Sequence, residues 1–184
     1  MSTLTIDTST FRKPGFAQRF FLRFVKWIKE EYRLTHYTHI RWKAENGDAM
    51  AQYNLAVMCE DGNGVFQTHA EAVKWYQKAA FQAIAPAQLA LGLKYLNGQG
   101  LAQNDSEALL WLRKAAEQGQ PEAQYQIGNL YRDGRGTNRD LLQAGKWYRK
   151  AADRGHPEAH KSFKELSSTN FGAAPPEAPT AQAA

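Results

Sequence analysis

The sequence predicts an all-α solenoid built from two-helix repeats with a period of 36 residues. Three tryptophans, Trp75, Trp111 and Trp147, are 36 residues apart. Two sets of glycines and the pair Ala-Ala keep the same spacing, at positions 62, 98 and 134, at 64, 100 and 136, and at 79–80, 115–116 and 151–152. Several residue types in phase over three cycles are typical of stacked helical repeats.

Each unit has the pattern of two helices. In the first unit, Ala51, Leu55, Val57 and Met58 form a helical apolar stripe that runs into Gly62. A glycine just past a helix suits the left-handed position that ends many helices. A second apolar stripe follows at Ala72, Val73, Trp75, Tyr76, Ala79 and Ala80.

The period divides the chain into six segments. We expect an N-terminal helical segment, three repeats, a half repeat that closes the stack, and a disordered tail rich in Ser, Pro and Ala. Their boundaries are 1–43, 44–80, 81–116, 117–152, 153–166 and 167–184.

The combined pattern resembles the Sel-one-like repeat, a relative of the tetratricopeptide repeat. The third unit carries it most fully, with Gly119, Ala123-Gln124, Ile127-Gly128, Tyr131, Gly134, Gly136, Trp147-Tyr148 and Ala151-Ala152. The resemblance implies a right-handed α/α superhelix that holds protein partners together. Some secreted relatives carry a disulfide in each repeat, whereas this chain has a single cysteine, Cys59. We therefore expect a protein of a reducing compartment.

The net charge of +5 is concentrated near the N-terminus. Residues 1–43 hold nine Lys/Arg against three Asp/Glu, and residues 44–166 hold fourteen of each. Because the repeats are electrically balanced, the basic composition does not indicate nucleic-acid binding.

Residues 16–33 are expected to form a basic amphipathic helix. Large apolar residues fall four apart from Phe16 to Tyr32, and Arg or Lys residues occupy the opposite side. Three roles remain open: a cap on the end of the stack, with 36–44 in register with a second helix; attachment to an anionic membrane surface; or docking into a partner's groove. The candidate contact residues are Phe20, Phe24, Trp27, Arg19, Arg23 and Lys26.

Residue patterns for catalysis or metal binding are weak. The Gly-x-Gly loops do not follow strands, so we expect them to form turns. His156 and His160 are four apart at a helix start, and His36 and His39 are three apart, without a third ligand in step. Cys59 is expected to be buried and inert. We expect a non-enzyme with no cofactor, no metal and no small-molecule substrate.

Binding is expected on the first helix of each repeat, which lines the concave face of such solenoids. Side chains just after the Ala-Gln pair, and those one turn on, should point into this groove and recognise a protein or peptide. The candidates are Tyr53, Asn54, Val57, Leu89, Leu93, Tyr125, Gln126, Asn129 and Arg132. Gln52, Gln88 and Gln124 are expected to hold the repeats together.

The sequence thus predicts an adaptor that binds a protein segment in its groove, with a membrane-associated scaffold anchored by 16–33 as the alternative. No stretch is apolar enough to cross a membrane, and the N-terminus lacks the pattern of a secretory signal. We expect the protein in the cytoplasm, either free or peripheral to the inner face of a membrane.

Overall fold

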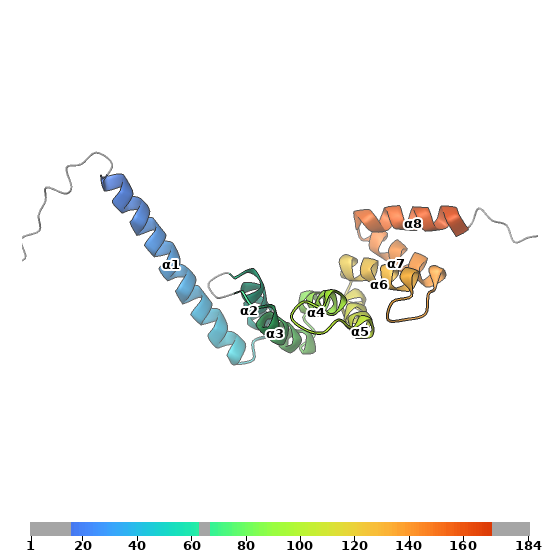
Figure 1. Cartoon of the computed structure of the whole chain (residues 1–184), viewed down its shortest axis with the longest axis horizontal. Helices are drawn as coiled ribbons and strands as arrows, with labels where there is room; N and C mark the ends of the chain where they lie inside the picture. The colour runs from blue at the N-terminus through green and yellow to red at the C-terminus, as the bar shows by residue number, and fades with distance from the viewer. Residues whose placement is uncertain (1–15, 63–66, 171–184) are drawn as a thin grey trace, which may run out of the picture.

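The structure, a computed structural model, describes residues 16–62 and 67–170, except for the side chains of 16–20, 22, 28–34, 169 and 170. These residues form eight helices and no strand, which confirms the predicted all-α solenoid (Figure 1). The helices are α1 (Phe16–Glu45), α2 (Ala49–Asp61), α3 (His69–Phe81), α4 (Ala85–Asn97), α5 (Asp105–Glu117), α6 (Pro121–Asp133), α7 (Leu141–Asp153) and α8 (Pro157–Asn170).

The six helices from α2 to α7 reproduce the period of the sequence. Each has 13 residues, and the first helices α2, α4 and α6 begin 36 positions apart, as do the second helices α3, α5 and α7. Each helix packs against the next along the chain. The repeats therefore differ in side chains and share one backbone plan.

Glycines set the close approaches between these helices. Gly62, Gly98 and Gly134 end the first helices with φ of 69°, 65° and 69°. Gly128 lies within α6, and a Cβ there would be 2.5 Å from a ring carbon of Tyr148 on α7. The absence of a side chain at Gly128 thus lets the two helices of a repeat pack closely.

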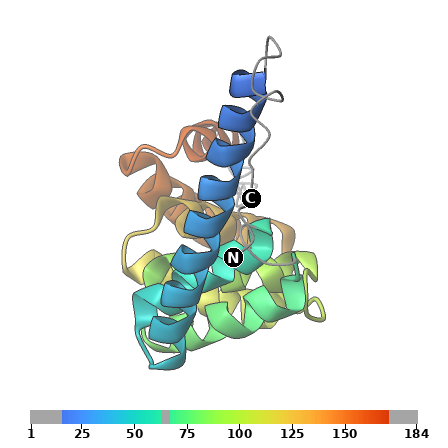
Figure 2. The same cartoon turned by 90° about the vertical axis from the view of Figure 1, so that its left-hand side faces the viewer.

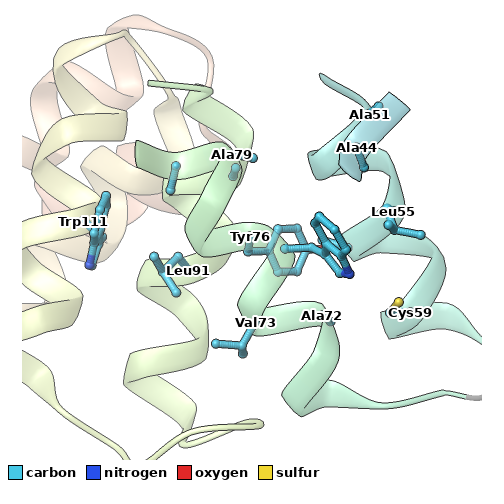
Figure 3. Packing of buried hydrophobic residues seen from close by; sticks show 14 residues of the cluster. Ala44, Ala51, Leu55, Cys59, Ala72, Val73, Tyr76, Ala79, Leu91 and Trp111 are labelled. Carbon is cyan, nitrogen blue, oxygen red and sulfur yellow. The ribbon is translucent and has the colours of Figure 1, made fainter. Parts of the chain in front are cut away.

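The core consists of two clusters of buried apolar residues along the stack. One buried cluster runs from Ala44 of α1 to Trp111 of α5 and includes Leu55, Tyr76 and Leu91 (Figure 3). Burial of these apolar side chains is the main force that holds the repeats together, because each repeat alone would leave its apolar face in water.

The recurrent glutamines join successive repeats, as predicted. The side-chain nitrogens of Gln52, Gln88 and Gln124 each donate a 3.1 Å hydrogen bond to a carbonyl eight residues earlier, near the end of the preceding helix (α1, α3 or α5). All three side chains are buried. They satisfy backbone groups inside the scaffold and present little to a partner.

The N-terminal helix α1 is one continuous helix of 30 residues, about 45 Å long. Its last turns pack on α2 through Tyr37, Ile40 and Ala44, which join the first core cluster. The rest of the helix extends away from the stack (Figures 1 and 2). The segments 16–33 and 36–44, treated separately in the sequence, are therefore parts of a single helix, because nothing between them breaks the helical backbone.

The C-terminal helix α8 is longer than the predicted half repeat. It continues to Asn170, so residues 167–170 of the segment expected to be disordered are helical. The physical reason lies in the period, because Asn170 stands 36 residues after Gly134, where the preceding first helix ends. Residues 171–184, the rest of the predicted tail, lie outside the described residues.

Candidate functional site

The nine predicted groove residues lie on α2, α4 and α6, and we call the face that they share the first-helix surface. Asn54 and Arg132 are exposed on this surface, and the other seven are half-buried. The nine residues are therefore accessible to different degrees, and several of them also pack the scaffold.

Three of the nine residues contribute to the core. Tyr53 and Val57 pack against the first cluster, and Leu89 packs against a second cluster centred on α5 and α6. The ring of Tyr53 lies 6.0 Å from that of Tyr76. Leu93 is half-buried on α4.

A polar cluster surrounds Tyr125 on α6. The ring of Tyr125 stacks on His156 at 4.5 Å and lies 5.7 Å from the ring of Tyr148. His156 precedes α8, and its Nδ1 accepts the backbone N–H of Ala159 at 3.2 Å, which caps the helix. Because Nδ1 accepts this bond, Nε2 carries the proton and donates to Glu122 Oε2 at 2.9 Å.

Hydrogen bonds extend this cluster along α6. Gln126 donates to Glu122 Oε1 at 2.7 Å, and Asn129 donates to Gln126 Oε1 at 3.3 Å. The hydroxyl of Tyr148 then donates to Asn129 Oδ1 at 2.8 Å. Three of the predicted residues, Tyr125, Gln126 and Asn129, are thus brought together and held in fixed orientations.

Arg132 lies at the end of this chain of hydrogen bonds. Its guanidinium makes two bonds with Asp133, at 2.7 and 3.0 Å. These bonds raise the pKa of Arg132 and lower that of Asp133. Burial raises the pKa of Tyr148 to about 12, against an opposing effect of Arg132. A depression of about 150 Å³ opens beside them, lined by Arg132, Tyr148, Ser162, Glu165 and Leu166.

A second polar cluster, which the sequence analysis missed, joins α2 to α4. Glu60 pairs with the buried ammonium of Lys94 and accepts the hydroxyl of Tyr76 at 2.7 Å. Lys94 also donates to Gln99 Oε1 at 3.0 Å. Partial burial acts to raise the pKa of Glu60, but the bonds from Lys94 and Tyr76 outweigh it and hold that pKa below its ordinary value. Burial first, and then the bond to Glu60, raise the pKa of Tyr76.

The repeat register contained a signal for this cluster. Lys94 stands where the other repeats have Met58 and Leu130, which are buried apolar residues. A charged residue at a core position of the repeat indicates a buried partner of opposite charge. Glu60 occupies the position of Arg132, two repeats earlier, and so falls on the first-helix surface.

The residues considered for chemistry have structural roles. Cys59 is buried, and burial followed by the charge of Glu71 raises the pKa of its thiol. Gly-x-Gly segments at 98–100 and 134–136 form helix ends and turns. Among the described residues, no group of three or more His, Cys, Asp or Glu is placed to hold a metal ion.

Four aromatic residues of α1, Phe21, Phe24, Trp27 and Trp42, are exposed. Phe24 and Trp42 are 18 residues apart, five full helical turns, and both are exposed. Ala44, which packs on α2, lies 20 residues from Phe24, on the other side of the helix. Phe21, Trp27, Arg23 and Lys26 are also exposed, whereas the side chains of Arg19 and Phe20 lie outside the described residues. Within the described residues, no helix is long and apolar enough to cross a membrane.

The sequence model of the Sel1 repeat matches residues 49–80, 85–120 and 121–156, and the chain belongs to this family. Proteins of the family are generally non-catalytic scaffolds that bind protein partners. The three matches correspond to the three predicted repeats, shifted by four or five residues at their starts. No curated protein matches the chain.

Solved structures show the same fold. A Sel1 repeat protein from Oxalobacter formigenes is 33% identical, with a TM-score of 0.72 over 83% of this chain and 63% of its own. The protective antigen c5321 of uropathogenic Escherichia coli is 38% identical, with a TM-score of 0.69 over 71% of this chain and 28% of its own. Cysteine-rich protein B of Helicobacter pylori is 18% identical, with a TM-score of 0.53 over 73% of this chain and 94% of its own, and shares the fold alone. The chain thus spans less than two thirds of the first two proteins.

Proposed function

We propose that the protein is an adaptor that binds a segment of a protein partner on the first-helix surface. The observation that carries this proposal is the arrangement of that surface: Leu89 and Leu93 lie on α4, between the Glu60 cluster on one side and the Tyr125 cluster on the other. A segment with an apolar centre and polar flanks would complement it. Side chains already held in place by hydrogen bonds lose little conformational entropy when a partner binds, which favours affinity.

The structure separates residues that can be tested from those that support the fold. The rings of Tyr53 and Tyr125 lie against those of the core residues Tyr76 and Tyr148, so their removal would disturb packing. Asn54, Leu93 and Arg132 lie one in each repeat and are exposed or half-buried. The combined replacement Asn54→Ala, Leu93→Ala and Arg132→Ala therefore removes contact groups from the surface with a small effect on the core.

The test is affinity capture of partners from the host, followed by calorimetric titration with each purified partner. We expect the triple variant to bind at least about tenfold more weakly, a loss of about 1.4 kcal/mol. The matched control is Phe81→Ala with Leu110→Ala, which removes exposed apolar groups from the second helices α3 and α5. Unchanged affinity of the triple variant, or an equal loss in the control, would overturn the proposed surface.

A second candidate function is attachment to the inner face of an anionic membrane through α1. The observation that favours it is the aromatic side of α1, where Phe24 and Trp27 stack with ring centroids 6.1 Å apart and remain exposed. Lys26 lies on the opposite side, and Arg23 borders the aromatic side one turn before Trp27. Lipid phosphates would gather near these two basic residues. An exposed aromatic side is available to a lipid surface.

Sedimentation with phosphatidylglycerol vesicles tests this candidate in the full chain. We expect Phe24→Ala with Trp27→Ala to release the protein from the vesicles, while the fold is unchanged because both side chains are exposed. The pair Phe81→Ala and Leu110→Ala again serves as the control. Equal sedimentation of all three proteins would contradict membrane binding through α1.

A further inference from the structure

An apolar groove lies open at the C-terminal end of the solenoid, between α7 and α8. It has a volume of about 300 Å³ and is lined mainly by Leu141, Leu142, Gly145, Phe163 and Leu166. Leu142 is 73% exposed. Gly145 stands where the earlier repeats have Val73 and Leu109, so the missing side chain widens the groove. An apolar surface of this kind at the end of a repeat array needs a cover.

In the preceding repeats, the loop after a first helix covers the surface that corresponds to this groove. After α6 ends, the loop crosses the start of α5, and Gly136 approaches so closely that a Cβ there would lie 2.4 Å from the carbonyl oxygen of Asp105. Gly100 approaches the start of α3 in the same way, with a Cβ position 2.5 Å from the carbonyl oxygen of His69. The loops that follow α4 and α6 therefore lie on α3 and α5, the second helices of the preceding repeats.

The sequence after α8 keeps the beginning of this loop. Asn170, the last residue of α8, stands at the position of Gly98 and Gly134, and asparagine is the residue that sometimes takes the place of glycine at helix ends. Gly172 stands at the position of Gly100 and Gly136. Of the two glycine positions of the loop, the second thus keeps its glycine, and the first holds a residue that is also found at helix ends.

The residue between Asn170 and Gly172 differs from its counterpart in the third repeat, and so does the residue that this counterpart contacts. In the third repeat, Arg135 makes two hydrogen bonds with Asp105, at 2.8 and 3.0 Å. Thirty-six residues further on, Arg135 is replaced by Phe171 and Asp105 by Leu141. An ion pair in one repeat therefore corresponds to two apolar residues in the next. Phe171 is also the sole large apolar residue in 171–184.

The end of the loop is not retained. In each preceding repeat, the N–H of Thr68, Asn104 or Asp140 closes the loop by donating to the carbonyl nine residues earlier, at 2.9 to 3.0 Å. The corresponding residue is Pro176, which has no N–H. Lys164 also replaces Gly92 and Gly128, which blocks the close packing of a further second helix on α8.

We propose that residues 171–173 fold back over the start of α7 as the loops of the earlier repeats do, and that Phe171 fills the apolar groove and caps the solenoid. The segment begins at the end of α8, beside the groove residues Leu166 and Ser167, so its local concentration at the groove is high. Helix α1 of a second copy is a poorer occupant, because it is basic and the groove is bordered by Lys146 and Arg149.

Amide hydrogen exchange of α8 in the full chain tests this cap. Burial of the Phe171 ring should stabilise the last helix, so we expect Phe171→Ala to lower the protection of α8 amides roughly tenfold and to leave α4 unchanged. Gly172→Ala should have a similar effect, because its Cβ would collide with the backbone of α7. A chain that ends after Asn170 should match Phe171→Ala, and a chain that ends after Ala174 should match the native protein.

The cap is supported if α8 loses protection in both Phe171→Ala and Gly172→Ala. Unchanged protection in either variant would overturn the proposal. An equal loss in the chains that end after Asn170 and after Ala174 would overturn it as well. Protection that rises with protein concentration would assign the groove to a second copy instead.

Discussion

Ala83 has a left-handed backbone with φ of 62°, the sole non-glycine residue with positive φ among those described. The corresponding positions hold Gly47, Gly119 and Gly155, with φ of 93°, 88° and 85°. A Cβ in this conformation costs about 1–2 kcal/mol. The turn is imposed by the helices on both sides of it, and the alanine bears the strain.

We therefore predict that Ala83→Gly raises the free energy of unfolding by about 0.5–1 kcal/mol, less than the full strain because glycine gains freedom in the unfolded chain. Urea unfolding with an unchanged m-value measures it. The control Ala90→Gly, within α4, should lower the stability by about 1 kcal/mol. A loss of stability in Ala83→Gly would contradict the strain.

Arg154 stands where the earlier repeats have a glutamine that hydrogen-bonds another glutamine. Gln82 donates to Gln52 Oε1 at 2.8 Å, and Gln118 donates to Gln88 Oε1 at 2.8 Å. Arg154 stands at the next position of this series, and Gln124 Oε1 is the one buried side-chain oxygen of the described residues without a hydrogen-bond partner. A buried polar atom without a partner costs about 1–3 kcal/mol.

The replacement Arg154→Gln should restore this contact and raise the free energy of unfolding by about 1 kcal/mol. The reverse change, Gln118→Arg, should deprive Gln88 Oε1 of its donor and lower the stability by a similar amount. Thermal unfolding of the two variants checks both signs. A lower melting temperature for Arg154→Gln would show that the guanidinium serves another contact.

At the scale of elements, the Glu60–Lys94 pair links α2 to α4 across one repeat. The two partners differ in burial, since the side chain of Lys94 is 5% exposed and that of Glu60 is 31% exposed. Loss of one partner is most costly when it strands the more buried charge. Removal of the Glu60 charge should therefore destabilise the protein more than removal of Lys94.

We predict that Glu60→Gln lowers the free energy of unfolding by about 2–3 kcal/mol, because the buried ammonium of Lys94 loses its counter-charge. Lys94→Met should cost less, about 1 kcal/mol or below, because Met58 and Leu130 occupy the same position in other repeats. Chemical unfolding of both variants gives the order. A larger loss for Lys94→Met would contradict the account of burial.

This pair also predicts a dependence on pH. The pKa of Glu60 is held below its ordinary value of 4.5, so its contribution to stability is present above that value and is lost as the pH falls through the lowered pKa. The difference in unfolding free energy between the native protein and Glu60→Gln should therefore shrink below about pH 4.5. A difference that stays constant from pH 7 to pH 3 would assign the effect to packing.

The sequence predicted the elements well where they repeat. Helices α2 to α7 follow from the 36-residue period, because identical spacing of Gly, Ala and Trp imposes the same turns and contacts three times. Outside the repeats, prediction depended on single patterns. Residues 16–33 and 36–44 lie on one helix, and α8 runs past 166, because helix ends depend on caps more than on apolar spacing.

The candidate site was predicted in part. Asn54 and Arg132, two of the nine predicted groove residues, are exposed. The Glu60–Lys94 cluster, in contrast, depends on side chains from two repeats that meet only in the folded chain. His156 was interpreted as part of a helix start, and it caps α8, but its stacking on Tyr125 could not be read from spacing. Contacts between side chains of different repeats thus cannot be predicted from the spacing of residues and are identified in the structure.

At the scale of the whole molecule, the chain is a short Sel1 solenoid with three distinct surfaces. The first-helix surface has an apolar middle between two polar clusters, α1 has an exposed aromatic side, and the C-terminal end leaves an apolar groove. Stability in such an array is a sum over neighbouring repeats, so each surface can change without loss of the others. This separation suits a scaffold.

The most direct test of the central claim is site-specific photo-crosslinking in the native host. A photoreactive amino acid placed at position 54 or 93 reports contacts of the first-helix surface, and one placed at 81 or 110 reports contacts of the second helices. The account predicts that positions 54 and 93 crosslink the same partner protein and that positions 81 and 110 do not. An excess of protein without the photoreactive group should reduce the crosslinking from 54 and 93. A partner crosslinked from 81 or 110, with none from 54 and 93, would contradict it.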